Sequence, residues 1–373
     1  MHRRIRPARL VALALALCVP AAGRAEEPAE KVFVGYLFGP PRDVDYKLYT
    51  HLCHAFLTAD ADGTIRLPRG ADGAELTAKA HAEKVAVLLS LGGWGWDDQF
   101  RRIAADPAIE ARYVDRVMEV IDRADYDGID LDWEYPDTAD EVAGFETLSR
   151  HFRERLDDLG KRKGRPMRLT MAASSNAGTL KWLDTAFLTR TYDWINVMTY
   201  DMAGDWTDYA GHNAPLFAST KAPRGRGPST AATIAFLLDE RKLPADKIAL
   251  GLPLYGRAFA VAEPYAIKPK VAPKTKLPNG DYRNVHKLLA EGGWKRTWDD
   301  EAKVPWLIAP DRSAVIGFDD AESIATKTEW AMKKGLRGVF FWQIHGDRLP
   351  DGSNPLQAAA LKAWRAGQGD KAP

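Results

Sequence analysis

Eight short apolar runs alternate with longer amphipathic stretches along this chain. The runs are about four to eight residues long and rich in Val, Ile, Leu and aromatic residues, which is typical of parallel strands buried on both faces. They occupy residues 31–37, 51–57, 85–91, 128–133, 168–173, 194–200, 248–252 and 338–342. Helix-like stretches lie between them, and the clearest are residues 107–123, 139–159, 229–241 and 321–334.

This order of elements predicts an α/β fold of the TIM (β/α)8 barrel type, in which each parallel strand is followed by a helix. A doubly wound open sheet shows the same alternation and is the alternative architecture. The chain has 373 residues, enough for one large barrel or for two average domains. Eight runs in one continuous pattern favour the single barrel.

One connection, residues 258–316, is unusually long for a barrel. It separates the seventh run from the helix before the eighth and is rich in proline and lysine. A connection of that length carries its own structure or a function. The aromatic residues that argue against a structureless loop are Tyr265, Tyr282, Trp294, Trp298 and Trp306. We therefore expect a small α+β subdomain on the carboxyl-terminal face of a barrel formed by residues 26–257 and 317–366, with a disordered tail at 367–373.

The first 25 residues have the pattern of a secretory signal peptide. Four arginines precede the apolar run at residues 10–19, and residues 23–25 form a small-x-small cleavage site. The run is shorter than the ~20 residues that span a bilayer. The alternatives are a buried N-terminal helix and a lipoprotein anchored at Cys18, although Leu17 stands where a small residue would precede a lipidated cysteine. We expect an exported chain, secreted or periplasmic.

Cleavage after Ala25 would change the charge balance of the chain. The full sequence has 52 Lys and Arg against 51 Asp and Glu residues, and its first 25 residues contain five arginines and no acid. The mature chain would carry 47 basic and 51 acidic residues, a formal charge of −4. We expect neither nucleic acid, which calls for a basic patch, nor a membrane as partner. Cys53 would be the remaining cysteine, and its apolar surroundings predict a buried, inert thiol.

The fourth run contains a row of carboxylates. Residues 127–136 read Asp-Gly-Ile-Asp-Leu-Asp-Trp-Glu-Tyr-Pro, and alternation along a strand places Asp130, Asp132 and Glu134 on one face. Like charges and burial both favour the protonated form of one member. Glu134 is last in the row, at the barrel mouth, where a protonated carboxyl group can give its proton to a leaving oxygen. A solvated acidic edge strand is the alternative, and the apolar residues between the acids oppose it.

The same stretch matches the Asp-x-x-Asp-x-Asp-x-Glu signature and resembles glycoside hydrolase family 18, which contains the chitinases. Further segments are similar to the family in the same order along the chain. They are residues 90–94 (SLGGW), 198–201 (MTYD), 251–257 (GLPLYGR), the long segment 258–316, which resembles the chitin-insertion domain, and Trp342. The resemblance extends from about Val32 to Trp364. Each short motif is weak alone, whereas several in the expected order are specific.

The resemblance implies four catalytic residues. Glu134 would be the general acid and later the general base, and Asp132 would turn toward it and bind the substrate's acetamido nitrogen. Asp130 would be the buried partner of Asp132, and Tyr200 would hydrogen-bond the acetamido oxygen. The implied reaction is hydrolysis of β-1,4-N-acetylglucosamine linkages in chitin or chito-oligosaccharides by a substrate-assisted, retaining mechanism, which differs from the two-carboxylate scheme.

The resemblance also implies a sugar-binding groove, because aromatic plates cover the apolar faces of sugar rings. The implied substrate-binding residues are Tyr36, Phe56, Trp94, Met198, Asp201, Trp206, Tyr255, Arg257 and Trp342, the last as the floor under the scissile sugar. The implied structural support consists of Asp127, Ser90, Gly92 and Gly93, and Tyr36 and Ser90 match the residues that hold Asp130. His54 departs from the family, whose members often carry an aromatic residue there, and we expect a hydrogen-bonded core residue rather than a metal ligand.

Two other functions remain open at this point. One is an endo-β-N-acetylglucosaminidase that acts on N-glycans or peptidoglycan, although the insertion favours long linear chains. The other is a non-catalytic chitin-binding lectin, and lectins of this kind have lost the acid that Glu134 represents here. The resemblance implies no cofactor and no metal, and we expect a monomer.

Overall fold

The computed structural model describes residues 29–68, 73–223, 225, 227–270, 277–278 and 280–368. The expected signal peptide and residues 369–373 of the expected tail lie outside this part of the chain. Gly367 and Gln368, also assigned to the tail, hydrogen-bond through their backbone N–H groups to Ala363 and Arg365. Within the described ranges, no helix has the length and apolar character needed to cross a membrane.

A closed ring of parallel strands forms the centre of the compact unit that begins at Lys31. Its strands are β1 (Val32–Phe38), β2 (His51–Ala59), β4 (Ala86–Gly92), β5 (Gly128–Asp132), β6 (Arg168–Ala173), β7 (Trp194–Val197), β8 (Ile248–Pro253) and β13 (Gly338–Trp342). Strand β1 pairs with β13 on one side and with β2 on the other, which closes the ring. The predicted barrel is therefore confirmed, and an open doubly wound sheet is excluded.

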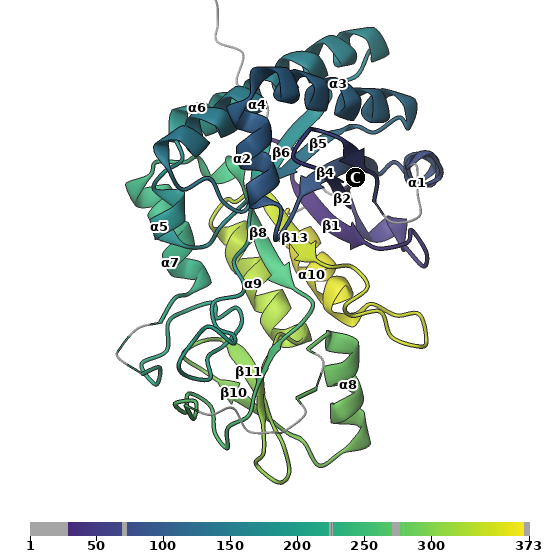
Figure 1. Ribbon diagram of the computed structural model, residues 1–373. Helices are drawn as coiled ribbons and strands as arrows, with labels where there is room; N and C mark the ends of the chain where they lie inside the picture. The colour runs from purple at the N-terminus through teal and green to yellow at the C-terminus, as the bar shows by residue number, and fades with distance from the viewer. Residues whose placement is uncertain are drawn as a thin grey trace, which may run out of the picture. The chain divides into compact units, whose positions relative to one another are not determined.

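Helices pack around the ring, as Figure 1 shows for α2, α3, α4 and α9. The helices are α1 (Ala74–Ala82), α2 (Asp97–Ala105), α3 (Pro107–Arg123), α4 (Ala139–Lys163), α5 (Ala177–Leu180), α6 (Thr185–Thr191), α7 (Thr230–Ala235), α9 (Ala321–Lys333) and α10 (Pro355–Ala366). Asp106 caps α3 by accepting from the N–H groups of Ala108 and Ile109, with Pro107 at the first helical position. The helix expected at 229–241 is α7 followed by a π-helical turn, Phe236–Glu240.

The alternation along the strands divides the core into two layers. Ile129, Leu131 and Trp133 pack outward, between the barrel and its helices. The inner layer fills the barrel with Tyr36, Cys53, Leu88, Trp194 and Phe340, among others. Cys53 is fully buried, as expected, and burial raises the pKa of its thiol, so the thiol is neutral and inaccessible.

A second, antiparallel sheet follows β8. Its strands are β9 (Arg257–Phe259), β10 (Lys295–Asp299), β11 (Val304–Ile308) and β12 (Val315–Gly317), in the order β10-β11-β12-β9, and α8 (Tyr282–Glu291) precedes β10 in the chain. Figure 1 shows α8, β10 and β11 beyond the arrowhead of β8, at the carboxyl end of that strand. Trp306 and Tyr282, two of the aromatic residues expected to order this segment, are buried. The sheet starts at Arg257, one residue before the expected boundary.

The described residues also contain three short elements: η1 (Tyr46–Leu48), β3 (Ile65–Arg66) and η3 (Ala245–Lys247). Strand β3 pairs antiparallel with the end of β2.

Candidate active site

The carboxylate row lies inside the barrel and ends at its mouth. Asp130 and Asp132 are buried, with 0% and 3% exposure, whereas Glu134, two residues past the end of β5, is half-buried. Trp133 points the other way, and its indole N–H donates to Asp97 Oδ1 at 2.7 Å. The predicted alternation therefore continues beyond the strand and keeps the acids on the inner side.

Asp130 is the fully satisfied member of the row. The hydroxyls of Tyr36 and Ser90 both donate to Oδ2 at 2.8 Å, while Thr170 and Asn196 donate to Oδ1 at 2.7 and 3.2 Å. Burial raises the pKa of Asp130, and these hydrogen bonds lower it. Sequence reasoning identified Tyr36 and Ser90 but missed Thr170 and Asn196.

Asp132, between the other two acids, lacks such a full set of hydrogen bonds. Its Oδ1 atom is buried and has no hydrogen-bond partner among the described residues. Burial raises the pKa of Asp132 well above its ordinary value, and the negative charges of Glu134 and Asp130 raise it further. A buried acceptor without a donor costs free energy, and a bound ligand with an N–H group could supply that donor.

Glu134 has the pKa of an acid that works near neutral pH. Burial raises the pKa of its carboxyl group from 4.5 to about 7, and the charge of Asp201 contributes in the same direction. A hydrogen bond with the Tyr135 side chain lowers the pKa but does not cancel the rise. A substantial fraction of Glu134 is therefore protonated at pH 7 and able to give a proton to a substrate.

Trp342, at the end of β13, is the centre of an aromatic group at the barrel mouth. Its ring stacks on Phe56 with centroids 5.6 Å apart and lies 5.8 Å from both Tyr36 and Phe38. Sequence reasoning missed Phe38, which is 51% exposed. The sequence did contain an indication of Phe38, because a large apolar residue at the carboxyl end of a barrel strand lies where barrel active sites form.

The backbone at the mouth has unusual conformations. Gly92 and Gly93 have φ angles of +101° and +87°, and a Cβ atom on Gly93 would lie 2.7 Å from the Phe56 ring. A Cβ atom on Gly92 would lie 2.5 Å from the carbonyl oxygen of Asp132. Only glycine fits these two positions. The peptide bonds before Phe56, Tyr135 and Gln343 are cis.

A polar cluster follows β7 and β8. Asp201 Oδ1 accepts hydrogen bonds from the Tyr255 hydroxyl at 2.8 Å and from Arg257 Nε at 3.0 Å. The guanidinium of Arg257 lies 5.1 Å from the Trp206 ring. Tyr200 is buried with its ring 6.1 Å from that of Tyr255, and burial raises the pKa of its phenol, so its hydroxyl can donate. Tyr255 lies beyond the end of β8, and Arg257 is the first residue of β9.

A cleft of about 340 Å³ lies beside Trp342. Asp201, Tyr255 and Arg257 line it, together with Asp281, which precedes α8. The barrel loops and the segment of the second sheet therefore both contribute to its walls. The remaining predicted groove residues are Trp94 and Trp206, which are 80% and 60% exposed, and Met198, which packs half-buried against the inner core layer.

The loop that carries Trp206 is attached to the segment between β9 and α8. The ammonium group of Lys268 donates to the carbonyl oxygens of Gly204 at 3.2 Å and Asp205 at 2.9 Å, immediately before Trp206. The backbone N–H of Lys268 also donates to the carbonyl of Asp208 at 2.8 Å. The long insertion thus fixes the backbone on both sides of an exposed tryptophan.

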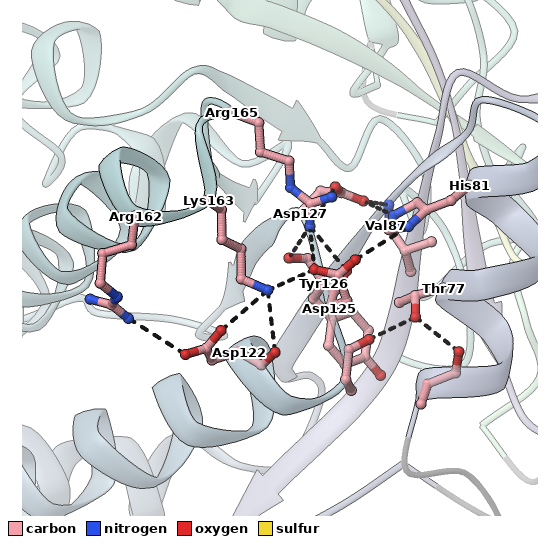
Figure 2. Close-up of polar contacts among 12 residues, drawn as sticks. Thr77, His81, Val87, Asp122, Asp125, Tyr126, Asp127, Arg162, Lys163 and Arg165 are labelled. Atoms are coloured by element: carbon pink, nitrogen blue, oxygen red, sulfur yellow. Dashed lines mark hydrogen bonds and ion pairs between the residues drawn. The ribbon is translucent and has the colours of Figure 1, made fainter.

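Asp127 and His54, which the sequence analysis named, lie away from the barrel mouth. Asp127 precedes β5, and its Oδ2 accepts from the Val87 N–H at 2.7 Å and contacts His81 Nε2 at 2.8 Å, as Figure 2 shows. His54 contacts the Tyr126 hydroxyl through Nδ1 at 2.7 Å, while its buried Nε2 has no partner among the described residues. Burial lowers the pKa of His54 to about 4. His54 is thus a neutral core residue, hydrogen-bonded through one nitrogen only.

The described residues at the barrel mouth form no metal-binding cluster. Across the ranges that the structure describes, no three His, Cys, Asp or Glu side chains are grouped so that they could hold a metal ion.

A closed parallel barrel with a protonatable carboxyl group beside aromatic plates at its mouth defines a glycoside hydrolase. Comparison with known protein families identifies which family of glycoside hydrolases this is. Residues 27–347 match Glycosyl hydrolases family 18, and the chain belongs to that family. It is 31% identical to Chitinase A1 of Niallia circulans over 73% of this chain and 42% of that protein. It is 30% identical to a class V chitinase of Arabidopsis thaliana over 88% of this chain and 87% of that protein.

A solved structure supports the same assignment. A variant of a family 18 chitinase from Cycas revoluta, crystallised with (GlcNAc)4, is 25% identical and has a TM-score of 0.78, covering 89% of this chain and 99% of that one. The chain therefore spans less than half of the first relative, and nearly the whole of the plant structure.

Proposed function

We propose that this chain hydrolyses β-1,4 linkages between N-acetylglucosamine units in chitin or chito-oligosaccharides. The observation that carries the proposal is Glu134, a carboxyl group at the barrel mouth whose pKa is about 7. Such a group can protonate the oxygen that leaves when a glycosidic bond breaks. Membership of family 18 and the chitinases among the relatives support the choice of substrate.

The first step of the proposed reaction uses the substrate as its own nucleophile. Asp132 and Glu134 project from the same side of one chain segment, so Asp132 is poorly placed to attack the anomeric carbon from the opposite face. The acetamido oxygen of the substrate attacks that carbon instead, the glycosidic C–O bond breaks, and Glu134 gives its proton to the leaving oxygen. Asp132 would accept a hydrogen bond from the acetamido N–H through Oδ1, the oxygen that has no partner within the described residues.

The second step returns the site to its starting state. The first step leaves an oxazolinium ion, and the Tyr200 hydroxyl would orient its oxygen. Glu134, now a carboxylate, takes a proton from water while that water attacks the anomeric carbon and opens the oxazolinium ring. Because the two displacements each invert the carbon, the product keeps the β configuration. Asp130, held by four hydrogen bonds, would act as the fixed neighbour that controls the charge of Asp132.

We also propose that the sugar chain lies along the aromatic and polar residues of the mouth. Trp342 would be the floor under the scissile sugar, next to Phe56 and Tyr36, with Trp94 and Trp206 as outer plates. Residues 258–316 would form a subdomain that walls the groove, set between the barrel segments 26–257 and 317–366. The support for this is the position of Asp281 on the 340 Å³ cleft beside Trp342.

The anomer of the first product tests this mechanism. NMR spectra of fresh hydrolysate from N-acetylglucosamine hexamer should show β-configured product before mutarotation. Plain β-1,4-glucan, the matched substrate without the acetamido group, should not be cut. An initial α product, or efficient cleavage of the glucan, would overturn the mechanism. Binding of the hexamer without turnover would indicate a lectin, and preferential cleavage of N-glycans or peptidoglycan would indicate the alternative glycosidase.

For the setting of the reaction, we propose that residues 1–25 direct export and that the mature chain acts as a monomer, secreted or periplasmic. The support is the arginine-rich start followed by a short apolar run. Expression of the full chain, followed by amino-terminal sequencing of the exported product and its sedimentation, tests both points. Retention of residues 1–25, or a stable dimer, would contradict them.

A further inference from the structure

Asn213 joins two loops at the barrel mouth. It lies between β7 and α7 and is 1% exposed. Its side-chain Oδ1 accepts a hydrogen bond from the backbone N–H of Asp201 at 3.1 Å, and its Nδ2 donates to the backbone carbonyl oxygen of Tyr255 at 3.1 Å. The side-chain amide has one accepting and one donating end, and it therefore connects the residues that follow β7 to those that follow β8.

The two residues that Asn213 joins also contact each other through their side chains. The Tyr255 hydroxyl donates to Asp201 Oδ1 at 2.8 Å, and Arg257 Nε donates to the same oxygen at 3.0 Å. Asp201 and Tyr255 both line the cleft beside Trp342. Asn213 thus holds the backbone at both ends of a hydrogen bond on the cleft wall, and a shift of either backbone would move the Asp201 carboxylate.

Asp201 has a backbone conformation that needs support. Its φ angle is +55°, in the left-handed region, which a residue other than glycine keeps only where the surrounding structure holds it. The backbone N–H groups of Asp201 and Met202 both donate to Asn213, the first to its side-chain oxygen and the second to its carbonyl oxygen at 2.9 Å. Asn213 therefore fixes two successive peptide groups at this position.

The residue before Asn213 is held by the second sheet. The His212 ring lies 4.1 Å from the ring of Trp306 on β11, and its Nε2 contacts Oδ2 of Asp299, the last residue of β10, at 3.4 Å. All three side chains are buried. Burial lowers the pKa of His212 to about 4, so the ring is neutral near pH 7. The long insertion thus fixes the part of the chain from which Asn213 reaches the two loops.

The position of Asp201 matters because its charge acts on the proposed acid. Burial is the largest cause of the raised pKa of Glu134, a hydrogen bond with Tyr135 lowers that pKa, and the charge of Asp201 raises it. The ionisable side chains that interact with Glu134 are Asp132 and Tyr135 from its own segment, and Tyr200 and Asp201 from the residues after β7. Arg257, after β8, pairs with Asp201.

We propose that Asn213 is a positioning residue of the glycosidase site: it fixes the loops after β7 and β8, so that the Asp201 carboxylate stays on the cleft wall where its charge acts on Glu134. Asn213 is buried and acts on the reaction through Asp201. The inference rests on the proposed function, because it assigns a supporting residue to the same site. Asn213 lies outside the segments 198–201 and 251–257 that resemble the family, although it connects them.

The first test is the pH profile of Asn213→Ala on a soluble N-acetylglucosamine oligosaccharide. Without the two side-chain hydrogen bonds the Asp201 carboxylate should leave its position, and we expect kcat/KM to fall about tenfold or more. The decline of kcat/KM at high pH should begin at a lower pH than in the parent, because the charge of Asp201 no longer raises the pKa of Glu134. Asp201→Ala should move the decline in the same direction.

The double variant Asp201→Ala/Asn213→Ala tests whether the two residues act together. If Asn213 acts through Asp201, the double variant should have the kcat/KM and the pH profile of Asp201→Ala. Circular dichroism verifies that each variant is folded. Should Asn213→Ala not fold, Asn213→Ser, which keeps a polar group near the two backbone partners on a side chain one bond shorter, is measured in its place.

Thr77→Val is the matched control, because it also removes a buried hydrogen bond between segments, from the Thr77 hydroxyl to the Ala124 carbonyl oxygen at 2.6 Å (Figure 2). Ala124 precedes β5 and Asp201 follows β7, so the two lie at opposite ends of the parallel barrel. The control should keep the kcat/KM and the pH profile of the parent.

A pH profile of the Asn213 variant that coincides with that of the parent, or losses that multiply in the double variant, would overturn the proposal. The proposed function would survive that result, because the parent would still hydrolyse the oligosaccharide. A parent without hydrolysis would overturn the function and the inference together.

Discussion

Asp130 and Asp132 are two residues apart on β5, yet Asp130 accepts four hydrogen bonds whereas Asp132 has a buried oxygen without a partner among the described residues. The four donated hydrogen bonds therefore stabilise the carboxylate form of Asp130. Asp132 lies between two other acids, and its pKa is raised well above the ordinary value, first by burial. A ligand N–H group that reached Oδ1 would satisfy the oxygen of Asp132 that the described residues leave without a donor.

Replacement of Glu134 by Gln keeps the size and polarity of the side chain and removes its transferable proton. We expect turnover of chito-oligosaccharides to fall at least ~10²-fold, the lower end for general acid catalysis, with oligosaccharide binding retained. Glu119→Gln, an exposed position on α3, is the control and should be fully active. Near-normal turnover in the Glu134 variant would remove Glu134 from its proposed role.

The activity should depend on pH through the same carboxyl group. Because Glu134 must be protonated to act as an acid and its pKa is about 7, kcat/KM should fall as the pH rises through about 7. The measurement is a kcat/KM profile on a soluble oligosaccharide from pH 5 to 9. A rate that stays constant from pH 6 to 9 would be incompatible with an acid of this pKa.

The raised pKa of Glu134 also predicts a change in stability with pH. Its folded-state pKa lies above the unfolded value of about 4.3, so the folded state binds the proton more tightly. The contribution of Glu134 to the free energy of unfolding should therefore be fully present below the unfolded pKa and should be lost as the pH rises through about 7.

Glu134→Gln removes the free-energy cost of ionising the Glu134 carboxyl group in the folded state. In urea denaturation we expect the variant to be more stable than the parent at pH 8, by up to about 3 kcal/mol, and equally stable at pH 4. A difference of the same size at both pH values would mean that packing, rather than ionisation, separates the two proteins.

Trp342 should act through the shape of the binding site. In Trp342→Ala the barrel should still fold, because the ring is half-buried at the mouth, but hydrolysis should drop at least ~10-fold as the aromatic floor is lost. Circular dichroism verifies folding. Trp182→Ala, which removes a tryptophan that is 41% exposed, is the control. Normal hydrolysis by the Trp342 variant would show that Trp342 is a packing residue and does not contribute to substrate binding.

Lys268 should influence binding of long substrates through Trp206. Its ammonium holds the two carbonyls before Trp206, so Lys268→Met should release the loop and raise KM for the N-acetylglucosamine hexamer about threefold or more. KM for the trimer should change little, because a shorter chain reaches fewer groove residues. Lys270→Met, in the same segment and exposed, is the matched control.

A double-variant test separates this explanation from a general loosening of the insertion. If Lys268 acts through Trp206, then Trp206→Ala/Lys268→Met should lose no more than Trp206→Ala alone. Additive losses, or equal losses for trimer and hexamer, would contradict the link between the two residues.

Much of the barrel was predictable because its signals are local. The eight runs coincide with the eight barrel strands to within a few residues, and the period-2 pattern places Asp130, Asp132 and Glu134 on one side of β5. The run at 194–200 ends earlier, at Val197. Met198 to Tyr200 are apolar or aromatic like the strand before them, so composition alone could not reveal where strand pairing stops.

Other features depend on contacts between distant parts of the chain. Thr170 and Asn196 look like ordinary polar residues of buried strands, and only the closed ring brings them to Asp130. Asp127 belongs to the same signature as Glu134, but it lies before the strand, and its partner His81 comes from α1. The antiparallel order of β9 to β12 likewise rests on pairings that a single sequence does not display.

The four donors to Asp130 come from four strands, β1, β4, β6 and β7. They converge only when those strands and β5 are correctly aligned with one another. A barrel closed with one strand shifted by a residue would turn that strand's donor to the other face and leave the buried carboxylate short of a hydrogen bond. The hydrogen bonds to Asp130, the residue proposed above to control the charge of Asp132, would therefore also disfavour barrels with wrongly paired strands.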